Sequence, residues 1–140
     1  MVQLIVGDKG KGKTISLLDK VNSEVKEALG SVVYIDKSTN HMYELNNRIR
    51  LINVSDFSLE NTDQFIGFIC GVISQDHDLE LVYIDSFLKV AKLSEDSDYA
   101  PVIRKIEAIG KKFDVNFTIC ISVDISDIPE DIRELVALSL

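Results

Sequence analysis

Short, continuously apolar segments alternate along this chain with longer amphipathic ones. The apolar segments are rich in β-branched residues, as expected for strands covered on both faces of a parallel sheet. The pattern predicts five strands: Val2–Val6, Ser31–Asp36, Arg48–Val54, Leu81–Asp85 and Asn116–Ser122. Polar and apolar residues are mixed in Arg48–Val54 alone, so we expect that strand to be the most exposed.

Between these strands, apolar residues recur at helical spacing and predict helices at Lys13–Leu29, 61–74 and Asp98–Phe113. Gly30 follows the first helix and is expected to cap its C-terminus. Pro101 lies in the first turn of the third helix, where proline is well tolerated. The expected buried face of the first helix comprises Ile15, Leu18, Val21, Val25 and Leu29.

The end of the chain has two interpretations. Pro129 and the apolar residues that follow it at helical spacing favour a short helix over Ile128–Leu138. The alternative is an edge strand at Leu135–Leu140. We expect the helix.

The alternation of strand and helix predicts βαβ units with right-handed crossovers. The expected fold is therefore a three-layer α/β/α domain with a mainly parallel five-stranded sheet, formed by residues 1–140 as a single unit. No apolar run approaches the ~20 residues that cross a bilayer. The N-terminal apolar run leads into glycines rather than a cleavage site, so we expect a cytoplasmic protein with no membrane contact.

The charge of the chain argues against nucleic acid as its main partner. The formal net charge is −8, and residues 41–140 hold nine basic and eighteen acidic side chains. Such a surface repels phosphate backbones, and no basic stripe interleaved with aromatic residues is present. The two cysteines, Cys70 and Cys120, lie in apolar stretches and are expected to be small core residues.

Residues 7–14 carry the clearest chemical motif. They match G-x-x-x-x-G-K-[ST] at every fixed position and read Gly7-Asp8-Lys9-Gly10-Lys11-Gly12-Lys13-Thr14. A predicted strand leads into the motif and a predicted helix leaves it, which is the context of a phosphate-binding P-loop. The glycines let successive N–H groups turn toward an anion. Lys13 is expected to reach the β- and γ-phosphates of ATP, and Thr14 to bind Mg²⁺.

Two further lysines make this loop unusually basic. We expect Lys11 to lie in solvent, whereas Lys9 could contact phosphate or lie in solvent. The alternative for the whole motif is a glycine-rich turn with solvated lysines, which the flanking strand and helix argue against.

The segment Leu79–Ser86 is a second element of the predicted site. It is mostly apolar and ends in Asp85, as a Walker B strand does. Asp85 is therefore expected to hold magnesium through water. The pattern gains weight from following a complete P-loop along the chain.

The order of P-loop, second strand, Asp85-Ser86 and strand Asn116–Ser122 resembles the RecA/DnaB-type P-loop ATPases. This resemblance implies a RecA-like core in which the Asn116–Ser122 strand lies between the P-loop strand and the Asp85 strand, with the other strands beyond Asp85. It also implies a polar sensor at the end of the Asn116–Ser122 strand, for which Ser122 is the candidate. The chain is similar as well to small uncharacterised bacterial ATP-binding proteins, some of them labelled PilT-like.

The resemblance also shows what hydrolysis would require. RecA-type enzymes carry a water-orienting glutamate near the position of Ser38, and other members of the class place it where Ser86 stands. Asp36 is the best substitute, because the carboxyl ends of parallel strands converge on the nucleotide. Asp56 and Asp124 end strands at the same edge, and all three could instead cap turns. No arginine is placed to serve as a finger within the same chain.

Three functions remain open. The first is a MgATP-binding regulator or adaptor with weak or partner-dependent hydrolysis, which we favour. The second is a minimal ATPase that forms ADP and phosphate. The third is a small-molecule kinase, which the lack of an arginine-bearing lid argues against. A protein partner or a second copy of the chain could complete the site.

Overall fold

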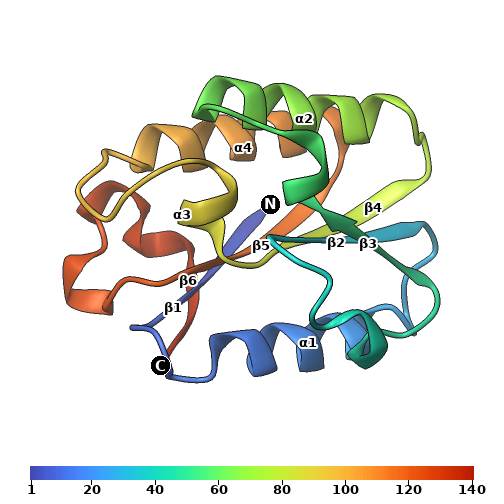
Figure 1. The fold of residues 1–140 in the computed structure, drawn as a ribbon, viewed down its shortest axis with the longest axis horizontal. Coiled ribbons are helices and arrows are strands. Elements are labelled where there is room, and N and C mark those ends of the chain that lie inside the picture. The colour runs from blue at the N-terminus through green and yellow to red at the C-terminus, as the bar shows by residue number, and fades with distance from the viewer.

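The computed structural model describes residues 1–140 and is built around a six-stranded sheet (Figure 1). All strand pairs are parallel, and the strand order is β3-β2-β4-β5-β1-β6. The strands are β1 (Val2–Val6), β2 (Ser31–Asp36), β3 (Ile49–Asn53), β4 (Leu79–Ile84), β5 (Asn116–Ile121) and β6 (Val136–Ser139). The implied order is confirmed: β5 lies between β1 and β4, and β2 and β3 lie beyond β4.

The apolar runs form strands because both faces of the sheet are covered. In β2, five of the six residues are buried, and β5 shows the same pattern. The edge strand β3 is more exposed, with Ile49 its one buried residue, as its mixed sequence predicted. Continuous apolar sequence is what a strand buried on both faces requires.

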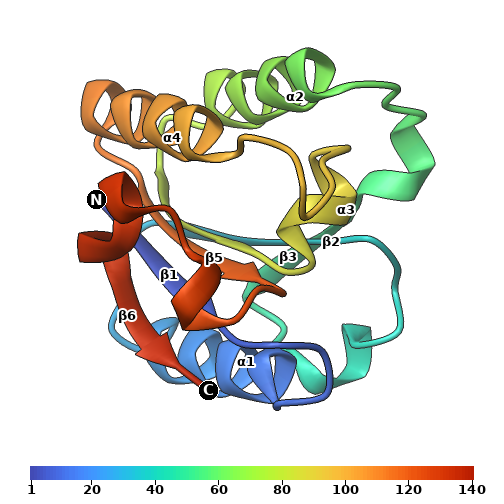
Figure 2. The same ribbon diagram turned by 90° about the vertical axis from the view of Figure 1, so that its left-hand side faces the viewer.

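Helices cover the two faces of the sheet (Figure 2). One face is covered by α1 (Lys13–Glu24), which contributes Leu17, Leu18 and Val21 to a cluster of eleven buried residues. On the other face, strand and helix residues together form a cluster of 27 buried residues. That cluster includes residues from α2 (Thr62–Ser74), α3 (Phe87–Val90) and α4 (Ala100–Phe113). No helix in the chain is both long enough and apolar enough to span a bilayer.

The first helix is shorter than predicted, and Leu18, Val21 and Val25 of its expected buried face are buried as predicted. It ends at Glu24, and both Ile15 and Leu29 are exposed, Leu29 at 99%. The guanidinium of Arg48 donates hydrogen bonds to carbonyl oxygens that follow the helix, those of Val25 and Ala28. An arginine therefore satisfies the C-terminal carbonyls for which a glycine cap was expected.

Gly30 serves a different purpose from the predicted helix cap. Its φ is not positive, whereas a Cβ at this position would lie 2.1 Å from the carbonyl oxygen of Asp78. Its amide also donates to the Glu80 carboxylate. Gly30 is thus required by the close approach of two backbone segments at the start of β2.

The C-terminal segment corrects the expected helix and the expected count of five strands. Residues Glu130–Leu135 form a 3-10 helix, and the chain then enters β6, which pairs with β1. The alternative of an edge strand was therefore right. The expected helical face fails because Ile132 is the one residue of Glu130–Leu135 that is buried, and the open edge of β1 offers hydrogen bonds instead. The chain then ends beside the loop that precedes α1 (Figure 1).

The cysteines differ in their surroundings. Cys120 is buried in β5, as expected, and its thiol donates a weak hydrogen bond to the carbonyl of Lys13. Burial raises the pKa of this thiol well above its ordinary value. Cys70 is exposed on α2, so the prediction of a core residue was wrong there. The apolar run around Cys70 is longer than the one helix face that the core can cover.

Candidate functional site

The loop of residues 7–14 connects β1 to α1 at the carboxyl edge of the sheet. Its glycines adopt positive φ angles of 155° at Gly7, 82° at Gly10 and 92° at Gly12. A Cβ at Gly10 or Gly12 would meet nothing within 4 Å, so it is the backbone conformation that calls for glycine there. Neither of these two amides donates a hydrogen bond within the chain, and no side chain caps the N-terminus of α1. The loop therefore presents free N–H donors at the positive end of a helix.

Lys13 is the buried cation of this loop. Lys13 is 7% exposed, and its Nζ donates a hydrogen bond to the Asp8 carbonyl oxygen at 2.9 Å. It forms no ion pair with a carboxylate. A buried charge without a counter-ion is costly, which makes the position suited to an anion.

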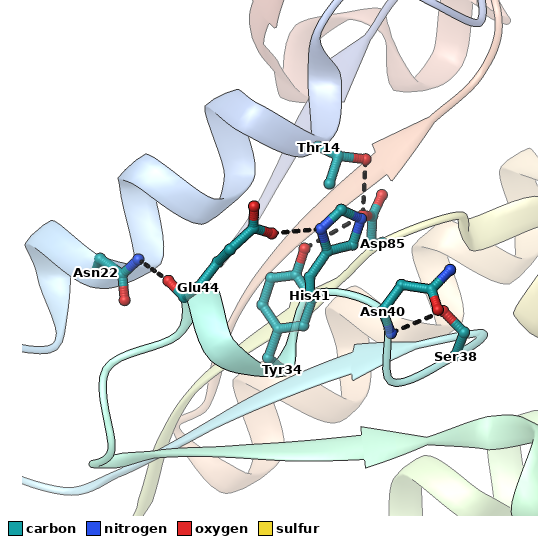
Figure 3. A network of polar contacts seen from close by, with 8 residues as sticks. All are labelled: Thr14, Asn22, Tyr34, Ser38, Asn40, His41, Glu44 and Asp85. Carbon is teal, nitrogen blue, oxygen red and sulfur yellow. Dashed lines mark hydrogen bonds and ion pairs between the residues drawn. The ribbon is translucent and has the colours of Figure 1, made fainter.

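Asp85 follows β4 and receives several hydrogen bonds (Figure 3). Its Oδ2 accepts from the Thr14 hydroxyl at 2.9 Å and from the Tyr34 hydroxyl at 3.2 Å. Its Oδ1 accepts from the backbone amide of Ser86 at 2.8 Å. The two predicted magnesium ligands, far apart in sequence, are thus in direct contact, and Tyr34 helps to hold the carboxylate in place.

Asp36 ends β2 and is 2% exposed. Its Oδ1 accepts a hydrogen bond from the Lys37 amide at 2.7 Å. Burial raises the pKa of this carboxyl, and the negative charge of Asp85 raises it further, while the Lys37 hydrogen bond and the His41 and Lys37 charges oppose the shift. The carboxyl is therefore poised to take up a proton more readily than an exposed aspartate.

A pocket of about 580 Å³ opens at this edge of the sheet. Seven of the predicted site residues line this pocket: Lys9, Gly10, Gly12, Lys13, Thr14, Asp85 and Ser122. Four other predicted site residues lie outside the lining: Gly7, Asp8, Lys11 and Asp36. The pocket includes Lys9, whose position the sequence left open, and excludes Lys11, which we expected in solvent.

Of the two other candidate aspartates, Asp124 caps a turn, which was the alternative given for it, and Asp56 lies within the 3-10 helix that Asn53 caps. Asp124 accepts hydrogen bonds from the side chain and amide of Ser126, which lower the pKa of its carboxyl. Asp56 accepts a long hydrogen bond from Asn53. Neither aspartate lines the pocket.

Several pocket residues were not among the predicted ones: Ile15, Lys37, Ser86, Leu88, Lys89, Leu93, Ser94 and Glu95. Lys37 directly follows β2, so the rule that strand ends converge on the site could have found it, whereas Lys89 lies on the short helix α3 after β4. Glu95 lies in a polar loop with no periodic pattern, and nothing in the sequence ties that loop to the site.

A parallel sheet in this strand order, with helices on both faces, defines an α/β protein whose architecture is consistent with a RecA-like fold. No protein-family model matches the chain, and no curated protein sequence does. Among solved structures, the chain is similar to the flagellar accessory protein FlaH from Methanocaldococcus jannaschii, with a TM-score of 0.58 and 13% identity. The similarity covers 96% of this chain but 65% of FlaH, so the chain spans just under two thirds of that protein. A likeness at this identity establishes the fold alone.

Proposed function

We propose that this protein binds a magnesium nucleoside triphosphate, ATP in the first instance, at the loop of residues 7–14. The observation that carries the proposal is Lys13, a buried ammonium with no carboxylate partner. It lies at the uncapped N-terminus of α1, beside glycine amides that donate no hydrogen bond within the chain. Cation, helix dipole and free amides together favour a phosphate group.

Thr14 and Asp85 are the residues suited to hold magnesium. Mg²⁺ prefers oxygen ligands, retains several waters and takes one or two protein ligands when it is bound with a nucleotide. A hydroxyl and a carboxylate in contact at 2.9 Å, next to the phosphate-binding loop, fit that requirement. The ion would supply positive charge between the phosphate oxygens. Tyr34 would keep the Asp85 carboxylate oriented toward it.

Within this proposal the protein is a nucleotide-dependent regulator or adaptor whose own hydrolysis is weak. Hydrolysis requires a carboxylate that orients the attacking water. Asp36 is buried outside the pocket lining, with one of its carboxylate oxygens bonded to an amide. A protein partner or a second copy of the chain would then be needed to complete a fast catalytic site.

Titration calorimetry tests the binding proposal. The protein is titrated with ATP, ADP and GTP in the presence of Mg²⁺, and phosphate release is then measured on the same sample. Micromolar ATP affinity with background-level phosphate release is the expected result. Absence of heat with every nucleotide would refute nucleotide binding, and rapid unassisted phosphate release would refute the regulator.

A second candidate, a minimal ATPase, is favoured by one specific observation. Glu95, in the loop after α3, is an acidic residue that lines the pocket together with Lys13 and Thr14. If this carboxylate orients water, Glu95→Gln abolishes a measurable turnover while ATP affinity is retained. The matched comparison is Asp36→Ala, which reduces turnover instead if the buried carboxylate is the one that acts. Turnover that is unchanged in both variants would exclude both residues.

A further inference from the structure

Three lysines besides Lys13 line the pocket, and they come from different parts of the chain. Lys9 belongs to the loop before α1, Lys37 directly follows β2, and Lys89 lies on α3. None of the three forms an ion pair, even though the chain carries a net charge of −8. Four lysines that line one pocket give it a local positive charge, which favours an anion there.

Lys37 and Lys89 line the same pocket and act on one another electrostatically. The Lys37 side chain lowers the pKa of the Lys89 ammonium, and the positive charge of Lys9 lowers it further. Two like charges side by side repel each other unless an anion lies between or beside them. The acidic side chains that line the same pocket, Asp85 and Glu95, form no ion pair with either lysine.

The arginines of the chain do not supply positive charge to this pocket. Arg48 binds the carbonyls that follow α1, and Arg104 pairs with Glu107 and Glu134. Arg133 lies beside Glu130, and Arg50 is on the edge strand β3. None of them lines the pocket. The cationic side chains that line the pocket besides Lys13 are therefore all lysines.

We propose that Lys37 and Lys89 form a cation pair that binds the terminal phosphate of a nucleoside triphosphate and thereby makes the site select triphosphates over diphosphates. This inference rests on the proposed nucleotide binding and adds that the site distinguishes triphosphates from diphosphates. The loop and Lys13 carry features that serve any phosphate chain. The cation pair comes from two other segments, the residue after β2 and the short helix α3, and matches the additional negative charge that a third phosphate brings.

The test compares MgATP and MgADP affinities by calorimetry at low ionic strength, where exposed charges are least screened. The variants are Lys37→Gln, Lys89→Gln and the double variant, with Lys105→Gln as the matched control. Lys105 is exposed on α4 and forms no hydrogen bond or ion pair. Each single variant should weaken ATP binding about tenfold and ADP binding less than about twofold, the size of one partly screened charge contact.

Charge, rather than shape, is the property that the pair is inferred to supply. Lys37→Arg should therefore retain most of the preference for ATP that Lys37→Gln loses. Thermal unfolding of each variant without nucleotide checks that the fold is intact. Because the substitution relieves repulsion between two ammonium groups, the melting temperature should stay the same or rise.

The outcomes separate this inference from the proposed function. If the unsubstituted protein binds neither nucleotide, the proposed function fails and the cation pair fails with it. If it binds ATP but the glutamine variants leave the ratio of ATP to ADP affinity unchanged, the cation pair alone is refuted. An equal loss of both affinities would likewise refute it, because the lysines would then act on the nucleotide as a whole.

Discussion

Replacing Lys13 by methionine tests whether this lysine binds a ligand or stabilises the fold. Methionine has nearly the same length and no charge, so the change removes the ammonium while it keeps most of the packing. Lys13 is 7% exposed, and its ammonium donates a hydrogen bond to the Asp8 carbonyl oxygen at 2.9 Å. We expect Lys13→Met to abolish nucleotide affinity and to leave the stability of the nucleotide-free protein unchanged or increased.

The opposite effects on affinity and stability follow from the structure. The Asp8 contact is a hydrogen bond to a charged group, worth about 1.5–3 kcal/mol. Its loss is offset because the buried ammonium, which has no counter-ion, no longer has to be desolvated, a cost of several kcal/mol. In the nucleotide complex the balance reverses. A phosphate charge about 4 Å from the ammonium contributes about 4 kcal/mol at an effective dielectric of 20, or roughly a thousandfold in affinity.

The assays are calorimetric titration with MgATP and urea unfolding without nucleotide. Lys11→Met is the matched control, because Lys11 belongs to the same loop, is exposed and lies outside the pocket lining. It should change affinity by less than about threefold, since an exposed charge contact contributes at most about 1 kcal/mol. The reasoning fails if Lys13→Met weakens ATP binding less than about tenfold. It also fails if the variant loses more than about 2 kcal/mol of unfolding free energy, because Lys13 would then be a structural residue.

Three further predictions concern the surrounding structure. Burial and the charge of Asp85 raise the pKa of Asp36 in the folded state. The contribution of Asp36 to stability is therefore present at low pH and is lost as pH rises through the folded pKa. Asp36→Asn should increase the free energy of unfolding by urea at pH 7 and remove this pH dependence. In Asp85→Asn the pKa of Asp36, followed by carboxyl NMR, should fall part of the way toward its ordinary value; an unchanged pKa would mean that burial alone sets it. Gly110→Ala should lower the free energy of unfolding by urea by about 1–3 kcal/mol, because its Cβ would lie 2.6 Å from the Val115 carbonyl oxygen. Gly67→Ala, in open space on α2, should instead raise it by about 0.5–1 kcal/mol. Equal effects of the two substitutions would contradict this packing.

The sequence predicted those parts of the fold and site that depend on short, local patterns. Continuous apolar runs predicted four of the first five strands, because a strand covered on both faces has no polar alternation to obscure it, and the mixed pattern of β3 matches its exposed edge position. The loop of residues 7–14 was found because its chemistry requires fixed spacing along the chain. Asp85 was predicted because an apolar strand that ends in aspartate follows the P-loop motif along the chain, and its side chain is in contact with that of Thr14.

The missed features depend on contacts that no local pattern encodes. The first helix ends early, and Arg48, which is distant in sequence, binds the carbonyls of Val25 and Ala28 that follow it. Residues 136–139 form a strand because β1 has an open edge beside them, although their apolar spacing also fits a helix. Lys37, Lys89 and Glu95 meet at one pocket only when three separate segments are folded together.

The sixth strand also affects the loop of residues 7–14, although none of its residues lines the pocket. The Leu140 amide donates to the Val6 carbonyl at 2.9 Å, and the Gly7 amide donates to the Val123 carbonyl at the same distance. A Cβ at Gly7 would lie 2.9 Å from the Leu140 carbonyl oxygen, and its φ of 155° is one that side chains rarely adopt. The first glycine of the motif is therefore fixed by packing against the segment that follows β6. Because the loop starts from that fixed point, the terminal strand helps to set the direction in which the free amides and Lys13 face the pocket.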